Sequence, residues 1–96
     1  MDLKVDPDLL AEAAASTAAS AASIVETLDS LSGSARDLQS RWDGEAQNAF
    51  TRRSSALDAQ WRLHAGTLRL AAERAARLAD EYRQADSDGA RAVLGL

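Results

Sequence analysis

The chain has 96 residues, a formal net charge of −4 at pH 7 and no cysteine. This length suits one small domain, the acidic balance argues against general nucleic-acid binding, and the lack of cysteine excludes a disulfide framework and thiol chemistry. An alanine-, leucine-, arginine- and glutamate-rich composition with one proline predicts an almost entirely α-helical protein. No segment resembles a signal peptide, and none is apolar over the length that a membrane-spanning helix needs.

A first helix is expected over about 7–42. Asp6 is suited to cap it, Pro7 to occupy its first position, and Asp8 to lie in its first turn, where the helix dipole favours an acid. Apolar and small residues then recur at alternating spacings of three and four, which is typical of a coiled-coil seam. This row consists of Leu10, Ala14, Thr17, Ala21, Ile24, Leu28, Leu31, Ala35, Leu38 and Trp42.

A turn is expected at 42–45, near the midpoint of the chain. Gly44 can adopt a positive φ without steric cost, and Asp43 can accept backbone N–H bonds at the start of a second helix. A connection this short makes the two helices antiparallel neighbours.

The second helix is expected over about 45–86, with Gly89 as the residue after its end and a flexible tail at 87–96. Its row again alternates between spacings of three and four, and a second apolar row of Ala49, Ala56, Leu63 and Leu70 runs beside it. The main row consists of Phe50, Ser54, Leu57, Trp61, His64, Leu68, Ala71, Ala75, Leu78, Tyr82 and Ala85.

Folding about the turn pairs Leu28 with Trp61 and Ile24 with His64. Two helices cannot bury both rows, and hairpins of this size rarely hold a sufficient core. The predicted fold is therefore all-α, an antiparallel two-helix hairpin that pairs with a second hairpin into a four-helix bundle. The predicted core of the hairpin and dimer consists of Ile24, Leu28, Leu31, Leu38, Phe50, Leu57, Trp61, His64, Leu68 and Leu78.

Little in the sequence supports catalysis or metal binding. The one histidine, His64, falls on the predicted seam, where a core role outweighs a catalytic or pH-sensing one. Residues 86–89 resemble part of a calcium loop, but the bidentate acid expected farther on falls at Gly95. We therefore expect no enzyme activity, no cofactor and no metal.

Two surface features have alternative interpretations. A basic row of Arg62, Arg69, Arg77 and Arg83 fits a solvated face with acidic partners four residues away, such as Glu73 with Arg77, better than a phosphate site. Tyr82 and Asp86 share one helical face, and an acid near a helix C-terminus costs stability. By physics alone they are equally a recognition surface or the ordinary end of the seam.

The central Trp42-Asp43-Gly44 and the later Tyr82-Arg83-Gln84-Ala85-Asp86 resemble the two motifs of the WXG, or early-secreted-antigen-like, family of type VII secretion substrates. The resemblance covers the whole chain. It implies helical hairpins that pair as homodimers or heterodimers and leave the cell folded, without a cleavable signal, through a membrane-embedded apparatus. It also implies that a cytoplasmic ATPase of the FtsK/SpoIIIE type recognises the C-terminal segment.

Carried over to this chain, the resemblance assigns Trp42, Gly44, Tyr82 and Asp86 to the secretion signal. It also implies a docking role for the apolar tail residues Val93, Leu94 and Leu96. Because about 37 helical residues separate the two halves of the signal by roughly 55 Å, only a partner hairpin could complete it. The alternative from another class is a helical adaptor or structural coiled coil that is never exported, and binding to a membrane surface is a weaker third.

Overall fold

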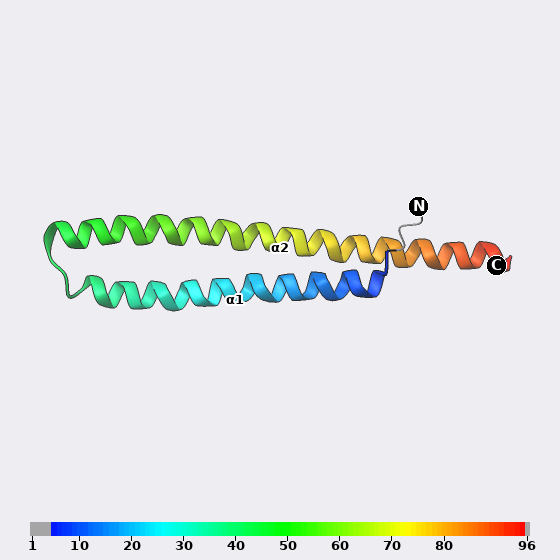
Figure 1. Ribbon diagram of the computed structural model, residues 1–96, viewed down its shortest axis with the longest axis horizontal. Helices are drawn as coiled ribbons and strands as arrows, with labels where there is room; N and C mark the ends of the chain where they lie inside the picture. Colours follow the sequence, from blue (N-terminus) through cyan, green and yellow to red (C-terminus); the bar gives the residue numbers. More distant parts are fainter. Residues whose placement is uncertain (1–4, 96) are drawn as a thin grey trace.

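The computed structural model describes residues 5–95 as two long helices, α1 (Pro7–Gln39) and α2 (Gly44–Leu94). They run antiparallel over most of their length, and the hairpin measures 76 × 22 × 17 Å (Figure 1). No strand occurs among the described residues. The prediction of an all-α helical hairpin is confirmed.

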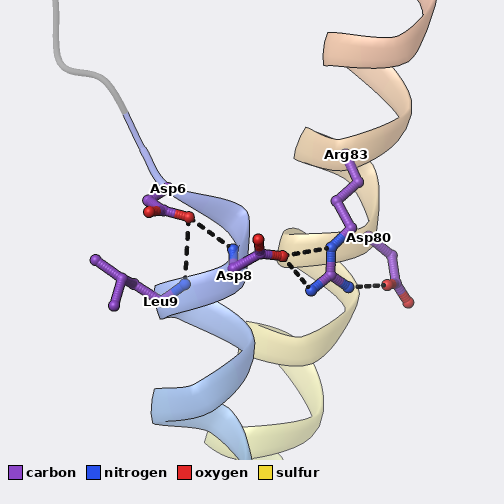
Figure 2. Close-up of polar contacts among 5 residues, drawn as sticks. All are labelled: Asp6, Asp8, Leu9, Asp80 and Arg83. Carbon is purple, nitrogen blue, oxygen red and sulfur yellow. Dashed lines mark hydrogen bonds and ion pairs between the residues drawn. The ribbon is translucent and has the colours of Figure 1, made fainter.

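α1 begins as predicted. The Oδ1 atom of Asp6 accepts hydrogen bonds from the backbone N–H groups of Asp8 (2.9 Å) and Leu9 (3.4 Å), and Pro7 occupies the first helical position (Figure 2). These bonds satisfy backbone donors that the first turn of a helix leaves free.

The connection between the helices is longer than predicted, because α1 ends at Gln39 rather than near Trp42. The N–H groups of Arg41 and Trp42 donate to carbonyls three residues back, and the Ser40 hydroxyl donates to the carbonyl of Asp37 at 2.6 Å. Serine side chains that bond to nearby backbone compete with helix continuation. Trp42 therefore lies in the loop and not in the last turn of α1.

α2 begins at Gly44, whose φ of +72° is in the left-handed region that favours glycine. Asp43 is extended at the cap position, but its side chain makes no capping hydrogen bond, contrary to the prediction. The helix start therefore depends on the backbone of Gly44 rather than on a side-chain cap.

The far end of α2 also differs from the prediction, since the helix continues through residues 87–94 and ends at Gly95, with φ +75°. A glycine inside a helix costs only about 1 kcal/mol relative to alanine, so Gly89 does not stop it. The side chain of Gln84 donates to Asp88 four residues later, at 3.0 Å, within this segment. Leu96 lies outside the described residues.

Alanine dominates the contact between the two helices. The buried residues recur at intervals of seven on each helix, as expected for a seam, and small side chains allow a close approach. They are Ala14, Ala21 and Leu28 on α1 and Ala65, Ala72 and Ala79 on α2.

The α1 row thus faces its partner as predicted up to Leu28, but the α2 contact lies one residue past the predicted row, at Ala65 rather than His64. Trp61 and His64 are exposed, so the expected pairs with Leu28 and Ile24 do not form the interior of the hairpin. Both rows have helical spacing, and the alanine row permits the closer helix packing.

Polar contacts across the hairpin fix its register. The Ser32 hydroxyl donates to Asp58 at 3.2 Å, and the Gln39 amide donates to the Thr51 hydroxyl at 2.9 Å. The guanidinium of Arg62 bridges Asp58 of its own helix, at 2.8 Å, and Asp29 of α1, at 2.9 Å. These contacts place the side of α2 that carries Arg62 against the side of α1 that carries Asp29.

Candidate functional site

The turn end of the hairpin displays Trp42. Its indole packs edge-on against Phe50 of α2, with ring centroids 5.0 Å apart and an interplanar angle of 68°, and 39% of the residue remains exposed. Edge-to-face pairs of this kind contribute about 0.5–1.5 kcal/mol beyond area burial. An open hollow of about 500 Å³ lies beside the ring and is lined by Trp42, Ala46, Ala49, Phe50, Arg52 and Arg53.

The opposite end displays Tyr82 and Asp86. Both are exposed, and their spacing of four residues places them on one face of α2. α1 begins only at Pro7, beside this level of α2, and the orange and red part of α2 extends beyond the start of α1 (Figure 1). We call residues 84–94 the overhang, because no part of α1 runs beside it.

An ion-pair cluster marks the point where the overhang begins. Arg83 donates from Nη2 to Asp8 at 2.9 Å and from Nε to the same oxygen at 3.3 Å, and its Nη1 reaches Asp80 at 3.3 Å (Figure 2). The hydrogen bond with Asp8 raises the pKa of Arg83 above its ordinary value. The first turn of α1 is thereby attached to α2 next to Tyr82.

Sequence reasoning did not find this Asp8–Arg83 contact. Asp8 was recognised only as a helix-start acid, and Arg83 only as a member of a basic face. The sequence offered one clue. In an antiparallel hairpin, the start of the first helix lies beside the later part of the second, which brings Asp8 near Arg83.

The predicted docking residues of the tail lie at the end of the overhang. Val93 and Leu94 are 87% and 71% exposed and belong to α2, where a flexible peptide was expected. Leu96, the third of them, lies outside the described residues.

The predicted core residues are divided between the interior and the surface. Leu28 is buried, Ile24 and Phe50 are half-buried, and an open cleft of about 640 Å³ lies between the helices near the turn. Most of the bulky members are exposed in the single hairpin, including Trp61, whose ring lies 6.0 Å from that of His64. The exposed members are Leu31, Leu38, Leu57, Trp61, His64, Leu68 and Leu78.

Three members of the basic row form ion pairs with acids. Arg62 and Arg83 bind acids across the hairpin, and Glu73 has Arg69 as its neighbour, at 4.0 Å, rather than the expected Arg77. The hydrogen bond from Arg62 lowers the pKa of Asp58, and the same bond raises the pKa of Arg62. These arginines therefore position the helices.

The structure does not bring the two halves of the predicted signal together. Trp42 and Gly44 lie at the turn, whereas Tyr82 and Asp86 lie at the open end of the same hairpin (Figure 1). About 40 residues of α2 separate them, which corresponds to roughly 60 Å at a helical rise of 1.5 Å per residue.

A family model described as proteins of 100 residues with WXG, WXG100, matches residues 2–87. The chain belongs to the WXG100 family. The matched range contains both the Trp42–Gly44 turn and the Tyr82–Asp86 face. Comparison with curated proteins and with solved structures gave no match.

WXG100 proteins are associated with type VII secretion substrates. They are small secreted helical proteins, not enzymes, and they generally form dimers with partner hairpins. Among the residues described for this WXG100 chain, neither helix is apolar enough over a sufficient length to cross a bilayer.

Proposed function

We propose that this WXG100 chain is exported as a folded dimer by a type VII secretion system, whose FtsK/SpoIIIE-type ATPase recognises its C-terminal end. The observation that carries the proposal is the overhang. Tyr82 is exposed just before the overhang, Asp86 is exposed on it, and Val93 and Leu94 are exposed at its tip. Within the described part of the chain, α1 does not extend beside residues 84–94. An exposed helix with apolar residues at its tip suits docking into a groove.

The exposure of the bulky row supports pairing with a second hairpin. Leu57 and Trp61 are 55% and 52% exposed, and both line the open cleft near the turn. Apolar surface of this extent on a slender hairpin is typical of a protein–protein contact. An antiparallel partner would also place its own Trp42 beside Tyr82 and Asp86, which completes the signal.

The direct test is export from a cell that carries a type VII system. Tyr82→Ala should lower the amount of protein in the culture supernatant at least tenfold and leave helical circular dichroism unchanged, because Tyr82 is not among the buried residues that hold the two helices together. Arg77→Ala, on an exposed face of the same helix, is the matched control and should be exported normally.

Export of Tyr82→Ala at the wild-type level would refute the assignment of the signal. Absence of the unmodified chain from the supernatant, with intact cells and a functioning system, would favour the non-exported adaptor instead.

The composite signal has a separate test. Trp42→Ala should reduce export more than it lowers helicity, since Trp42 lies in the loop, outside both helices, and its ring packs against Phe50 near the start of α2. A general loss of helical structure in this variant would mean that Trp42 acts in folding instead.

A further inference from the structure

Arg83 lies within reach of three acids. Asp80 precedes it by three residues and Asp86 follows it by three, a spacing at which side chains on a helix surface are neighbours. Asp8 is the third, and the first turn of α1 brings it against α2. The guanidinium of Arg83 therefore has a choice of partner, and one of the three candidates, Asp86, belongs to the proposed signal.

In the structure the guanidinium pairs with the two acids that are not in the signal. Nε and Nη2 of Arg83 both donate to Oδ1 of Asp8, and Nη1 lies 3.3 Å from Asp80. Each of its three nitrogens thus has a partner. Figure 2 shows the guanidinium directed toward these two carboxylates and away from the overhang.

Asp86 is left without such a partner. It is exposed, and none of the ion pairs in the described part of the chain includes it. Side chains on a helix lean toward its N-terminus, which favours the Asp80 side of Arg83, but an exposed pair of this kind is weak. Asp8, contributed by the other helix, adds the two further bonds that hold Arg83 on that side.

We propose that Asp8 is a positioning residue of the export signal: together with Asp80 it holds the guanidinium of Arg83 away from Asp86, so that the carboxylate of Asp86 stays available to the receptor. This inference rests on the proposed function and adds to it a role for the start of α1. Without the two acids, Arg83 turns to Asp86 and neutralises it.

Attachment of α1 to α2 is a different role for the same contacts, and it predicts a different pattern of variants. If export needs only the attachment, removal of Arg83 is as harmful as removal of its partners. If Asp8 keeps Arg83 from Asp86, removal of Arg83 is harmless and also corrects the loss of the partners.

The test starts from a release variant that carries Asp8→Asn and Asp80→Asn, which keep the size of each side chain and remove its charge. Its export should fall about two- to fivefold, because an exposed pair between Arg83 and Asp86 is weak and masks the acid only part of the time. Addition of Arg83→Gln should restore export to the parent level, and Arg83→Gln alone should be exported normally.

Two features of this series serve as controls. The triple variant still lacks the acid in the first turn of α1, so its recovery separates the masking of Asp86 from any loss of helix stability. Glu73→Gln removes an acid from an exposed pair with Arg69, away from the signal, and should be exported normally.

Nuclear magnetic resonance follows the guanidinium without any export. In the parent, nuclear Overhauser contacts should join side-chain protons of Arg83 to the β protons of Asp8. In the release variant, the same protons should contact the β protons of Asp86.

Export of the release variant at the parent level, or failure of Arg83→Gln to restore it, would overturn the inference. A release variant in which Arg83 does not contact Asp86 would overturn it as well. If the unmodified chain is not exported but Arg83 changes partner as expected, the proposed function fails and the positioning of Arg83 by Asp8 stands. If Tyr82→Ala blocks export and the release variant does not lower it, the proposed function stands and this inference fails.

Discussion

The ring of Trp42 packs against α2 and is not part of α1. Its predicted place was the last position of the α1 row, but the helix ends before it and the ring packs against Phe50. The motif residue Gly44 is equally local, because its positive φ directs the chain into α2. The Trp-x-Gly sequence therefore builds the turn and also displays an aromatic surface there.

Gly44→Ala should lower the free energy of unfolding by roughly 1–2 kcal/mol, the cost of placing a side chain in a left-handed conformation. An added Cβ would meet no atom within 4 Å, so backbone conformation accounts for the whole loss. Gly33→Ala is the control, since a Cβ there is also in open space and φ is helical. It should stabilise the protein by about 0.5–1 kcal/mol in the same urea titration. A neutral Gly44→Ala would contradict this role of the turn.

Asp58 should make stability depend on pH in acid. Its pKa is lowered in the folded chain by the hydrogen bond from Arg62, so its contribution is complete above the unfolded pKa of about 3.9 and is lost as pH falls through the folded value. Asp58→Asn should therefore lower the thermal midpoint at pH 7, and its difference from the parent should shrink toward pH 2.

The control for this measurement is Asp37→Asn. Asp37, on the exposed surface of α1, pairs with Arg41 of the loop that follows, 3.2 Å apart, and this pair does not connect α1 with α2. It should have little effect at either pH. A difference between Asp58→Asn and the parent that stays constant from pH 7 to pH 2 would exclude the Arg62 bond as its source.

At the scale of the elements, the spacing of apolar residues was sufficient to predict two helices and a hairpin. It was not sufficient to choose between adjacent rows of α2, because the alanine row at Ala65 and the bulky row at His64 have the same period. Which row faces α1 depends on what packs against each of them. The sequence contains α1, which packs against one row, but it does not contain whatever packs against the other.

The end of α2 was mispredicted for a related reason. Asp88-Gly89 is typical of a helix stop, but the cost of one glycine is small, and the left-handed residue that ends the helix is Gly95. The residues of the proposed signal were assigned through family resemblance, whereas the Asp8–Arg83 contact beside them could be identified only once the register of the hairpin was known.

Gly89→Ala should stabilise the overhang without changing the rest of the hairpin. The substitution favours helix by about 1 kcal/mol, and the added Cβ meets no atom within 4 Å. Amide hydrogen exchange should slow at residues 84–94, which have no partner from α1, and stay unchanged around Ala65 and Ala72. Unchanged exchange at the overhang would mean that something other than intrinsic helix propensity limits its stability.

At the scale of the whole molecule, a single hairpin buries few large apolar side chains. Five of the six residues that are buried in the described part of the chain are alanines, whereas most of the larger apolar side chains are exposed. Burial of alanine removes little apolar area from water compared with leucine or tryptophan. A single hairpin therefore leaves most of its large apolar side chains in contact with water, and the proposed pairing would bury them.

The thermal midpoint should consequently depend on protein concentration. If folding and association are coupled, dilution favours unfolded monomers, and a hundredfold dilution should lower the midpoint by several degrees. Trp61→Ala removes a large exposed side chain from the bulky row and should lower the midpoint at every concentration. A parent midpoint that is independent of concentration over this range would show that one hairpin is stable alone.

The unequal lengths of α1 and α2 have a further consequence for how a dimer is bound. In the proposed antiparallel pair, each chain would contribute its C-terminal end to a different end of the assembly, so an overhang on each chain would give two projecting helices that point in opposite directions. The body between them is tens of ångströms long, and a single compact receptor cannot hold both projecting helices at once. An oligomeric receptor with suitably spaced grooves can hold both, and the second contact then forms at a high effective concentration. The excess length of α2 over α1 would thus make the proposed dimer bivalent.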